Sequence, residues 1–288
     1  MTVHVPSKLV GRLLILATAL LWSTGGLFAK APIFDSWSPE VRGPVLTFWR
    51  AAFAAAVLVP LIRRPRWSVY LAPMSLCFTL MCITYLSAMI LTTAANAIWL
   101  QNTAPAWVFL ISVLLLREPP ARRDLPTLAF AALGVGTILL FEVQGQEILG
   151  VACGVTAGVT YACVIVFTRL LRNQNAVWLV ALNHVVATAL MLPWVLWLGV
   201  VPSAAQLLVL AGFGILQMGI PYVLITRGLR SISSQEAIGI CLIEPVLNPV
   251  WVFLLWGEVP AWWTVVGASL ILAGLVLRYV FFLGRGMK

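Results

Sequence analysis

The chain alternates between long runs of apolar residues and short connections that hold most of its polar residues. A transmembrane helix needs about 20 predominantly apolar residues to cross a bilayer. Runs of about this length predict membrane-spanning helices at residues 10–30, 43–62, 69–91, 95–116, 124–141, 147–168, 176–198, 204–226, 236–256 and 261–282. The pattern therefore predicts an all-α integral membrane protein of ten transmembrane helices, with connections too short to hold a soluble domain.

Lysine and arginine gather at the N-terminus and after every second predicted helix. The clusters are Lys8 and Arg12; Arg63, Arg64 and Arg66; Arg117, Arg122 and Arg123; Arg169 and Arg172; Arg227 and Arg230; and Arg278, Arg285 and Lys288. Cytoplasmic loops of membrane proteins accumulate Lys and Arg, so we expect these connections and both chain termini in the cytoplasm. The other connections carry Asp35, Glu40, Glu142, Glu147 and Glu258.

Composition supports this interpretation. The 288 residues are 62% hydrophobic and 9% charged, whereas a soluble domain is typically about half apolar and about a quarter charged. The net charge of +9 lies in short loops between helices, which indicates orientation and contact with anionic lipids rather than binding of nucleic acid. The five cysteines fall inside apolar runs, and no phosphate-binding G-x-x-x-x-G-K-[ST] motif occurs. We therefore expect no metal and no cofactor.

The two halves of the sequence resemble each other. At an offset of 140 residues, Asn96 aligns with Glu236, Ala97 with Ala237, Ile98 with Ile238, Pro105 with Pro245, Glu118 with Glu258, and Gly134 with Gly274; at 139, Trp22 aligns with Tyr161 and Lys30 with Arg169. We predict two five-helix repeats, residues 1–144 and 145–288. Because five is odd, the second repeat crosses the membrane in the opposite sense. Such inverted repeats are typical of alternating-access transporters, whose substrate sites lie near the membrane midplane.

Four segments carry a family resemblance: LLWSTGGLFAK, FWRAAFAA, ANAIWLQNTAPAWVFLISVLLLREPP and QEAIGICLIEPVLNPVWVFLLWGEVPAWWTVVGASLILAGLVL. With the ten helices in two inverted halves, the chain resembles the drug/metabolite transporter superfamily, specifically the EamA type. The resemblance implies a carrier of the plasma membrane, in bacteria the inner membrane, often an exporter of amino acids, other metabolites or toxic compounds. It also implies a central cavity lined mainly by the first, third, fourth, sixth, eighth and ninth helices.

Glu244 is the leading candidate for chemistry, because it lies roughly 12 Å into the predicted ninth helix at 1.5 Å per residue. A carboxylate at that depth marks a transport pathway or a proton relay by default; a structural role beside Pro245 is the alternative. Arg50, roughly 10 Å deep in the second helix, pairs with Glu244, binds a substrate carboxylate, or snorkels to the outer interface. His184 is a third proton-coupling candidate, with a hydrogen bond to a neighbouring helix as its alternative.

Polar and aromatic residues inside the predicted helices are candidates for binding substrate. They are Trp22, Tyr85, Trp99, Gln101, Asn102, Tyr161, Gln217, Tyr222, Glu244 and Asn248. The aromatic members would suit an organic cation or an aromatic ring if they converge, whereas lipid or core contact explains each one singly. Pro105, Pro245 and Pro249 each remove a helical hydrogen bond and are candidate hinges, although packing alone also explains them. We expect Gly134, Gly136, Gly267 and Gly274 to permit close helix packing.

The sequence thus favours a secondary active transporter that moves a small metabolite or amphipathic solute, amino acid-like or an organic cation, in the export direction. The proton is the candidate coupling ion, and the protein is a monomer or a homodimer in the lipid bilayer. An intramembrane enzyme is one alternative, but G-x-S-x-G and H-E-x-x-H motifs are absent and the two histidines, His4 and His184, lie far apart in sequence. The other alternative is a membrane assembly subunit without transport activity, which a solvent-filled midplane cavity would argue against.

Overall fold

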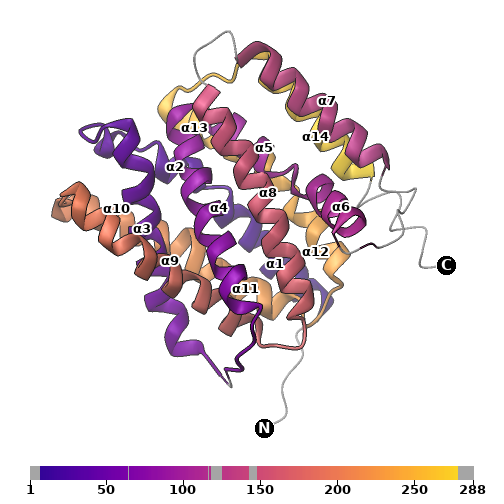
Figure 1. The fold of residues 1–288 in the computed structure, drawn as a ribbon, viewed down its shortest axis with the longest axis horizontal. Coiled ribbons are helices and arrows are strands. Elements are labelled where there is room, and N and C mark those ends of the chain that lie inside the picture. The colour runs from indigo at the N-terminus through magenta and orange to yellow at the C-terminus, as the bar shows by residue number, and fades with distance from the viewer. Residues whose placement is uncertain (1–6, 64, 116, 118–124, 143–147, 278–288) are drawn as a thin grey trace.

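The computed structural model describes residues 7–63, 65–115, 117, 125–142 and 148–277. Several sequence predictions lie outside these ranges: the basic residues Arg64, Arg122, Arg123, Arg278, Arg285 and Lys288, the acidic residues Glu118 and Glu147, His4, both chain termini, and the repeat boundary at 144/145. The side chain of Glu142 is also not described. Every regular element in the described ranges is helical (Figure 1).

Most predicted spans are present as one helix or as consecutive helical segments. The elements are α1 (Lys8–Trp22), α2 (Gly25–Ala29), η1 (Pro32–Phe34), α3 (Pro39–Leu58), η2 (Val59–Leu61), α4 (Leu71–Leu91), α5 (Ala94–Gln101), α6 (Ala104–Leu114), α7 (Leu125–Glu142), α8 (Ile148–Leu170), α9 (Ala176–Leu198), α10 (Ala204–Gly214), η4 (Ile215–Gly219), α11 (Ile220–Gly228), α12 (Ser234–Cys241), α13 (Ile243–Trp256) and α14 (Trp262–Val276). Among the described residues, eight helical segments are long and apolar enough to cross a membrane. The shorter apolar helices α7 and α14 occupy the fifth and tenth predicted positions, so the count of ten stays a prediction.

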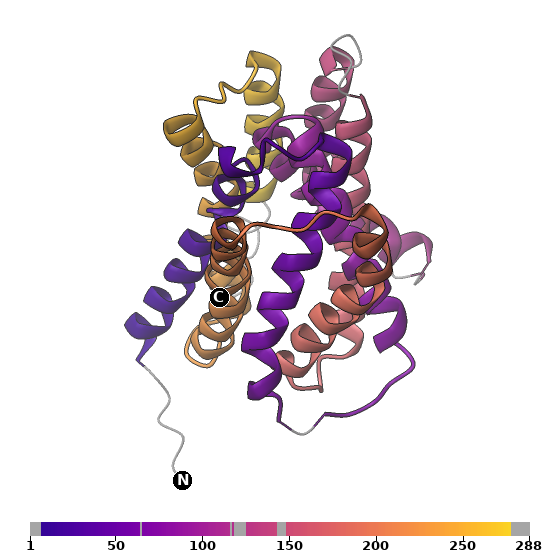
Figure 2. The ribbon, with the colours of Figure 1, turned by 90° about the vertical axis from the view of Figure 1, so that its left-hand side faces the viewer.

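The reversals of the chain divide the protein into two ends (Figures 1 and 2). At one end α1 begins, α8 ends beside Arg169, and α11 ends beside Arg227. We call this the basic end. Asp35, Glu40 and Glu258 lie in or beside the connections at the opposite end. Since α1 begins at the basic end and α8 ends there, these two matched helices of the predicted repeats run in opposite directions.

Two spans are interrupted at matching positions of the predicted repeats. The fourth span ends one helix at Gln101 and begins another at Ala104, and the ninth span ends α12 at Cys241 and begins α13 at Ile243. In each case a proline, Pro105 or Pro245, follows four residues after the helix ends. A proline ring clashes with the carbonyl four residues before it and has no N–H to donate, which explains why the helices stop there.

The first span is interrupted without a proline, between Trp22 and Gly25. The hydroxyls of Ser23 and Thr24 donate to the carbonyls of Leu20 and Leu21 at 2.7 and 2.6 Å, and such local bonds compete with helical ones. Side chains from other helices form hydrogen bonds with polar groups at the break. Gln217 Nε2 donates to the Trp22 carbonyl at 3.3 Å, and Trp251 Nε1 donates to Ser23 Oγ at 2.9 Å.

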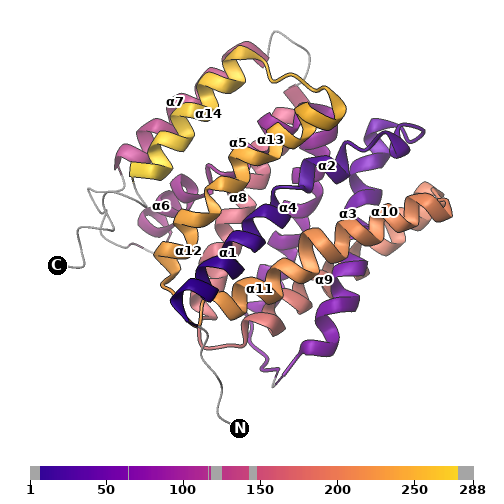
Figure 3. The ribbon, with the colours of Figure 1, turned by 180° about the vertical axis from the view of Figure 1, so that it is seen from behind.

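Helices α7 and α14 lie side by side at one edge of the molecule (Figure 3). A Cβ added to Gly134 would lie 2.6 Å from the carbonyl oxygen of Gly267, and one added to Gly267 would lie 2.7 Å from the carbonyl oxygen of Gly134. These two glycines therefore allow the two backbones to touch. Gly136 does not take part in such a close contact, because nothing lies within 4 Å of a Cβ added there.

Candidate functional site

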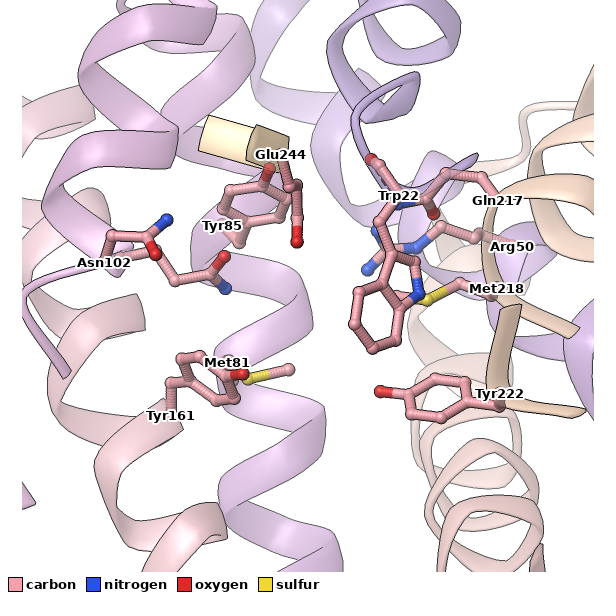
Figure 4. A pocket seen from close by; sticks show the side chains of 11 residues that line it. Trp22, Arg50, Met81, Tyr85, Asn102, Tyr161, Gln217, Met218, Tyr222 and Glu244 are labelled. Carbon is pink, nitrogen blue, oxygen red and sulfur yellow. Dashed lines mark hydrogen bonds between the residues drawn. The ribbon is translucent and has the colours of Figure 1, made fainter. Parts of the chain in front are cut away.

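A polar chamber lies at the centre of the molecule, where the interrupted spans meet (Figure 4). It is lined by Trp22, Arg50, Met81, Tyr85, Gln101, Asn102, Tyr161, Gln217, Met218, Tyr222 and Glu244. The central part has a volume of about 100 Å³. Nine of these eleven residues are among the sequence-predicted site residues, so the fold brings together side chains that are distant in sequence.

Two wider branches extend from the chamber toward the basic end, and both share Trp22 and Tyr161 with its centre. One, of about 270 Å³, reaches Thr168 near the end of α8 and Ala176 at the start of α9. The other, of about 390 Å³, reaches Leu229 after α11 and Ala237 in α12. Ligand pockets usually begin at about 300 Å³, so the larger branch has room for a small solute on the side of the basic end.

Arg50 on α3 faces the chamber instead of the membrane surface. The residue is only 2% exposed, and its guanidinium lies 5.2 Å from the ring centroid of Phe213 on α10. Among the described residues its Nη1 has no hydrogen-bond partner, and no ion pair joins it to Glu244. A buried guanidinium with an open donor is suited to a carboxylate ligand, whereas the snorkelling alternative requires exposure that Arg50 lacks.

Glu244 lies in the first turn of α13, on the chamber wall near Tyr85 (Figure 4). The interruption at Leu242 gives the ninth span a second helix N-terminus, whose dipole favours negative charge. Glu244 is partly exposed within the chamber and therefore stays accessible to a solute or a proton. Arg50 and Glu244 thus supply one positive and one negative group to the same chamber.

Polar amides gather around Gly25, at the interruption of the first span. A Cβ added to Gly25 would lie 3.3 Å from Gln217 Nε2, 3.5 Å from Asn248 Nδ2 and 3.8 Å from Tyr85 Oη. Within the part of the chain that the structure describes, Gln217 Oε1 and both amide atoms of Asn248 are buried without a hydrogen-bond partner. Unsatisfied buried polar groups are costly, which is consistent with a site that a ligand or water completes.

The aromatic members of the chamber come from four helices. Trp22 packs edge to face with Tyr222 at a centroid distance of 5.4 Å, and Tyr161 lines the chamber centre and both branches. Tyr85 lies beside Glu244 in the close-up view (Figure 4). The arrangement provides apolar ring surfaces next to the two charged groups, as an amphipathic solute requires.

Of the candidates for substrate binding and proton coupling, Trp99, His184 and the fully buried Asn248 do not line the chamber. Trp99 is 5% exposed in the hydrophobic core and lines a separate apolar pocket between α5, α13 and α14. His184 is 1% exposed behind the rings of Phe78 and Tyr222, and its Nδ1 donates to the Val180 carbonyl at 2.8 Å. The alternative interpretation expected an acceptor on a neighbouring helix, whereas the acceptor here is on the same helix, α9.

Met81 and Met218 line the chamber and are absent from the sequence predictions. The position of Met81 could have been found from spacing, because Met81 lies one helical turn before Tyr85. Met218 directly follows Gln217, and adjacent residues do not share a helix face, so spacing gave no signal for it. A flexible thioether adapts to ligands of different shape. Within the described ranges, no group of three His, Cys, Asp or Glu side chains could hold a metal ion.

The packing differs on the other side of the chamber, toward the opposite end. Asn248, Val252, Ala94 and Ala97 are fully buried there. A Cβ added to Gly26 would lie 2.5 Å from Asn248 Oδ1 and 2.6 Å from Val252 Cγ2. Close packing of α2 against α13 therefore separates the chamber from the opposite end.

Comparison with known proteins identifies the family and agrees with the fold. A relative from Archaeoglobus fulgidus named "Uncharacterized transporter" is 26% identical over 273 residues, which cover 93% of this chain and 96% of the relative. A solved structure described as "Crystal structure of protein" superposes with a TM-score of 0.65 at 20% identity, covering 97% of this chain and 99% of that chain, and so shares the fold. Residues 9–140 and 148–280 each match the EamA-like transporter family. The sequence-based family prediction is confirmed: the chain belongs to the EamA-like transporters of the drug/metabolite transporter superfamily and is a multi-pass membrane transporter.

Proposed function

We propose that the protein is a secondary active transporter that exports a small amphipathic solute through the central chamber by alternating access. The observation that carries this proposal is a polar chamber near the middle of the spans, extended toward one end and closely packed toward the other. A membrane assembly subunit would fill that volume with aliphatic side chains. The described spans therefore support transport over a scaffolding role.

The orientation follows from the basic residues. With Arg169, Arg172, Arg227 and Arg230 in the cytoplasm, the chamber opens inward and both chain termini are cytoplasmic. In this orientation a solute loads from the cytoplasm, as export requires. The membrane is the plasma membrane, which is the inner membrane in a bacterium.

The charges of the chamber favour an amino acid-like zwitterion as the solute. Arg50 has an open donor for a carboxylate, and Glu244 can accept from an ammonium group. An organic cation is the second candidate, because Trp22, Tyr161 and Tyr222 line the same chamber as Glu244. In either case Glu244 is the group that would exchange a proton during the transport cycle.

Flux measurements in proteoliposomes test the proposal. Vesicles that contain the protein are expected to accumulate or release radiolabelled amino acids, or quaternary amines, faster than vesicles that contain Arg50→Gln or Glu244→Gln. Absence of solute-dependent flux across a broad panel of amino acids, amines and other metabolites would contradict a transport function. A thermal-shift screen of the same panel identifies ligands independently, since a ligand that binds the folded state stabilises it.

A further inference from the structure

We propose that Lys30 and Glu258 form an outer clasp that holds the chamber closed at the end opposite the basic residues. The inference rests on the proposed alternating-access function and concerns the gate of the same chamber. Lys30 ends α2 of the first span, and Glu258 follows α13 of the ninth span. Their side chains form an ion pair with Nζ and Oε2 2.6 Å apart, and each side chain is only about one fifth exposed.

The ion pair binds a third element, the turn between α4 and α5. Lys30 Nζ donates to the carbonyl of Thr92 at 2.9 Å, and Glu258 Oε1 accepts from the N–H of Ala94 at 2.7 Å. Thr92 is the C-cap of α4, and Ala94 is the first residue of α5. An ammonium therefore meets the negative end of one helix dipole, and a carboxylate meets the positive end of another.

The clasp joins two groups of helices that line the chamber and that also pack on each other beyond it, α13 on α5 and α2 on α4. The first and ninth spans pack together, with α1 against α12 and α2 against α13 (Figure 3). On the other side, α4, α5 and α6 pack against α8. Lys30 and Glu258 belong to the first group, whereas Thr92 and Ala94 belong to the second, so opening the chamber at this end requires the clasp to release.

The ion pair at the other end of the same two spans is different in kind. Arg12 and Glu236 lie 2.6 Å apart at the basic end, with side chains 55% and 34% exposed. This pair joins the starts of α1 and α12, which already belong to one group of helices. Exposed ion pairs contribute little to stability. Because both partners lie in the same group of helices, this pair does not close the chamber.

Cysteine accessibility tests the clasp without relying on transport. Val252 is fully buried beside Gly26, between the chamber and the clasp. In a variant that lacks the five native cysteines and carries Val252→Cys, we expect slow reaction with a membrane-impermeant maleimide applied to the outer face of vesicles. Lys30→Gln or Glu258→Gln is expected to raise that rate about tenfold, because each substitution removes a charge-assisted bond from the closed state only.

Two further variants sharpen the test. Lys30→Arg keeps the charge and the donors and should retain slow labelling. Asp35→Asn breaks another ion pair at the same end, formed with Arg42 at 2.8 Å, but both partners flank one connection and do not cross the chamber. Each variant is tested only as protein that elutes as a folded species. An unchanged labelling rate of residue 252 in both Lys30→Gln and Glu258→Gln, or an equal rise of that rate in Asp35→Asn, would overturn the proposal.

A second site reports the other side of the chamber. A separate variant keeps Cys241, which lines the wider branch toward the basic end, and lacks the other four native cysteines. Its labelling from the inner face should slow when Lys30→Gln or Glu258→Gln is added, whereas residue 252 in the first variant becomes reactive from the outer face. If the clasp variants label faster from the outer face but the protein shows no solute flux, the clasp proposal is supported and the transport proposal is contradicted. If solute flux is normal but the clasp variants label at the unchanged rate, the clasp proposal is contradicted and the transport proposal is not.

Discussion

Replacing Arg50 by glutamine is expected to separate solutes that carry a carboxylate from those that do not. The guanidinium is nearly inaccessible to bulk solvent and has an open donor among the described residues, so a bound carboxylate would replace a missing partner. A hydrogen bond to a charged group contributes about 1.5–3 kcal/mol. At about 1.4 kcal/mol for each factor of ten, Arg50→Gln should weaken binding of such a solute about 10- to 100-fold.

Paired ligands provide the assay. Phenylalanine and phenethylamine share a side chain and an ammonium group, and leucine and isoamylamine form a second pair; in each pair only the amino acid has the carboxylate. Dissociation constants from isothermal titration of the purified protein should rise for the amino acid and stay within about twofold for the amine. Glu244→Gln should weaken both members of each pair, because the ammonium is common to them.

Arg50→Gln removes both the charge of Arg50 and its contact with Phe213, so the two effects need separate controls. Arg50 stacks on Phe213 at 5.2 Å, a contact of about 0.5–2 kcal/mol, so thermal unfolding of ligand-free Arg50→Gln should be compared with that of Phe213→Leu. Phe213→Leu keeps the guanidinium and is expected to reduce amino acid binding far less than Arg50→Gln does. Equal losses for amino acid and amine in Arg50→Gln would refute the assignment of Arg50 to the carboxylate.

Two other changes test the remaining assignments. In proteoliposomes with an imposed pH gradient, Glu244→Gln should abolish the dependence of solute flux on the gradient. Glu236→Gln, at the basic end of the same span, is the control and should keep that dependence. Unchanged dependence in Glu244→Gln would contradict the proton-coupling proposal. Gly134→Ala should destabilise the protein by about 1–3 kcal/mol through overpacking of α7 on α14, measured as a lower midpoint of thermal unfolding. Gly136→Ala is the matched control and should be neutral or slightly stabilising; equal effects would contradict the close approach of the two backbones.

The interruptions of the spans show which parts of the fold a sequence pattern reveals. Pro105 and Pro245 mark the breaks of the fourth and ninth spans, because the effect of a proline on the preceding turn is local. The break after Trp22 has a local cause in the hydroxyls of Ser23 and Thr24, which the apolar pattern does not report. Its partners Gln217 and Trp251 approach from other spans and could not be predicted from periodicity.

The site residues also divide into those that spacing along the helix can place and those that depend on contacts with other helices. Trp99 and Gln101 are two residues apart, and neighbours at that spacing point about 200° apart on a helix, so one side of the chamber cannot receive both. Gln101 lines the chamber, and Trp99 lies in the core. For Arg50 the sequence left pairing, ligand binding and snorkelling open, because the choice depends on burial and on the ring of Phe213.

Differences between the matched halves carry mechanistic information. The fourth and ninth spans are both interrupted, as their matching prolines require in any state of the protein. The first span is broken at Trp22, whereas its counterpart α8 runs unbroken past Tyr161; α4 is continuous, whereas the eighth span contains the π-turn η4. The break in the first span follows in part from sequence, because the hydroxyls of Ser23 and Thr24 bond carbonyls of their own turn. Because Gln217 Nε2 of η4 donates to the carbonyl of Trp22, the two asymmetric features contact each other, and both lie at the wall of the chamber.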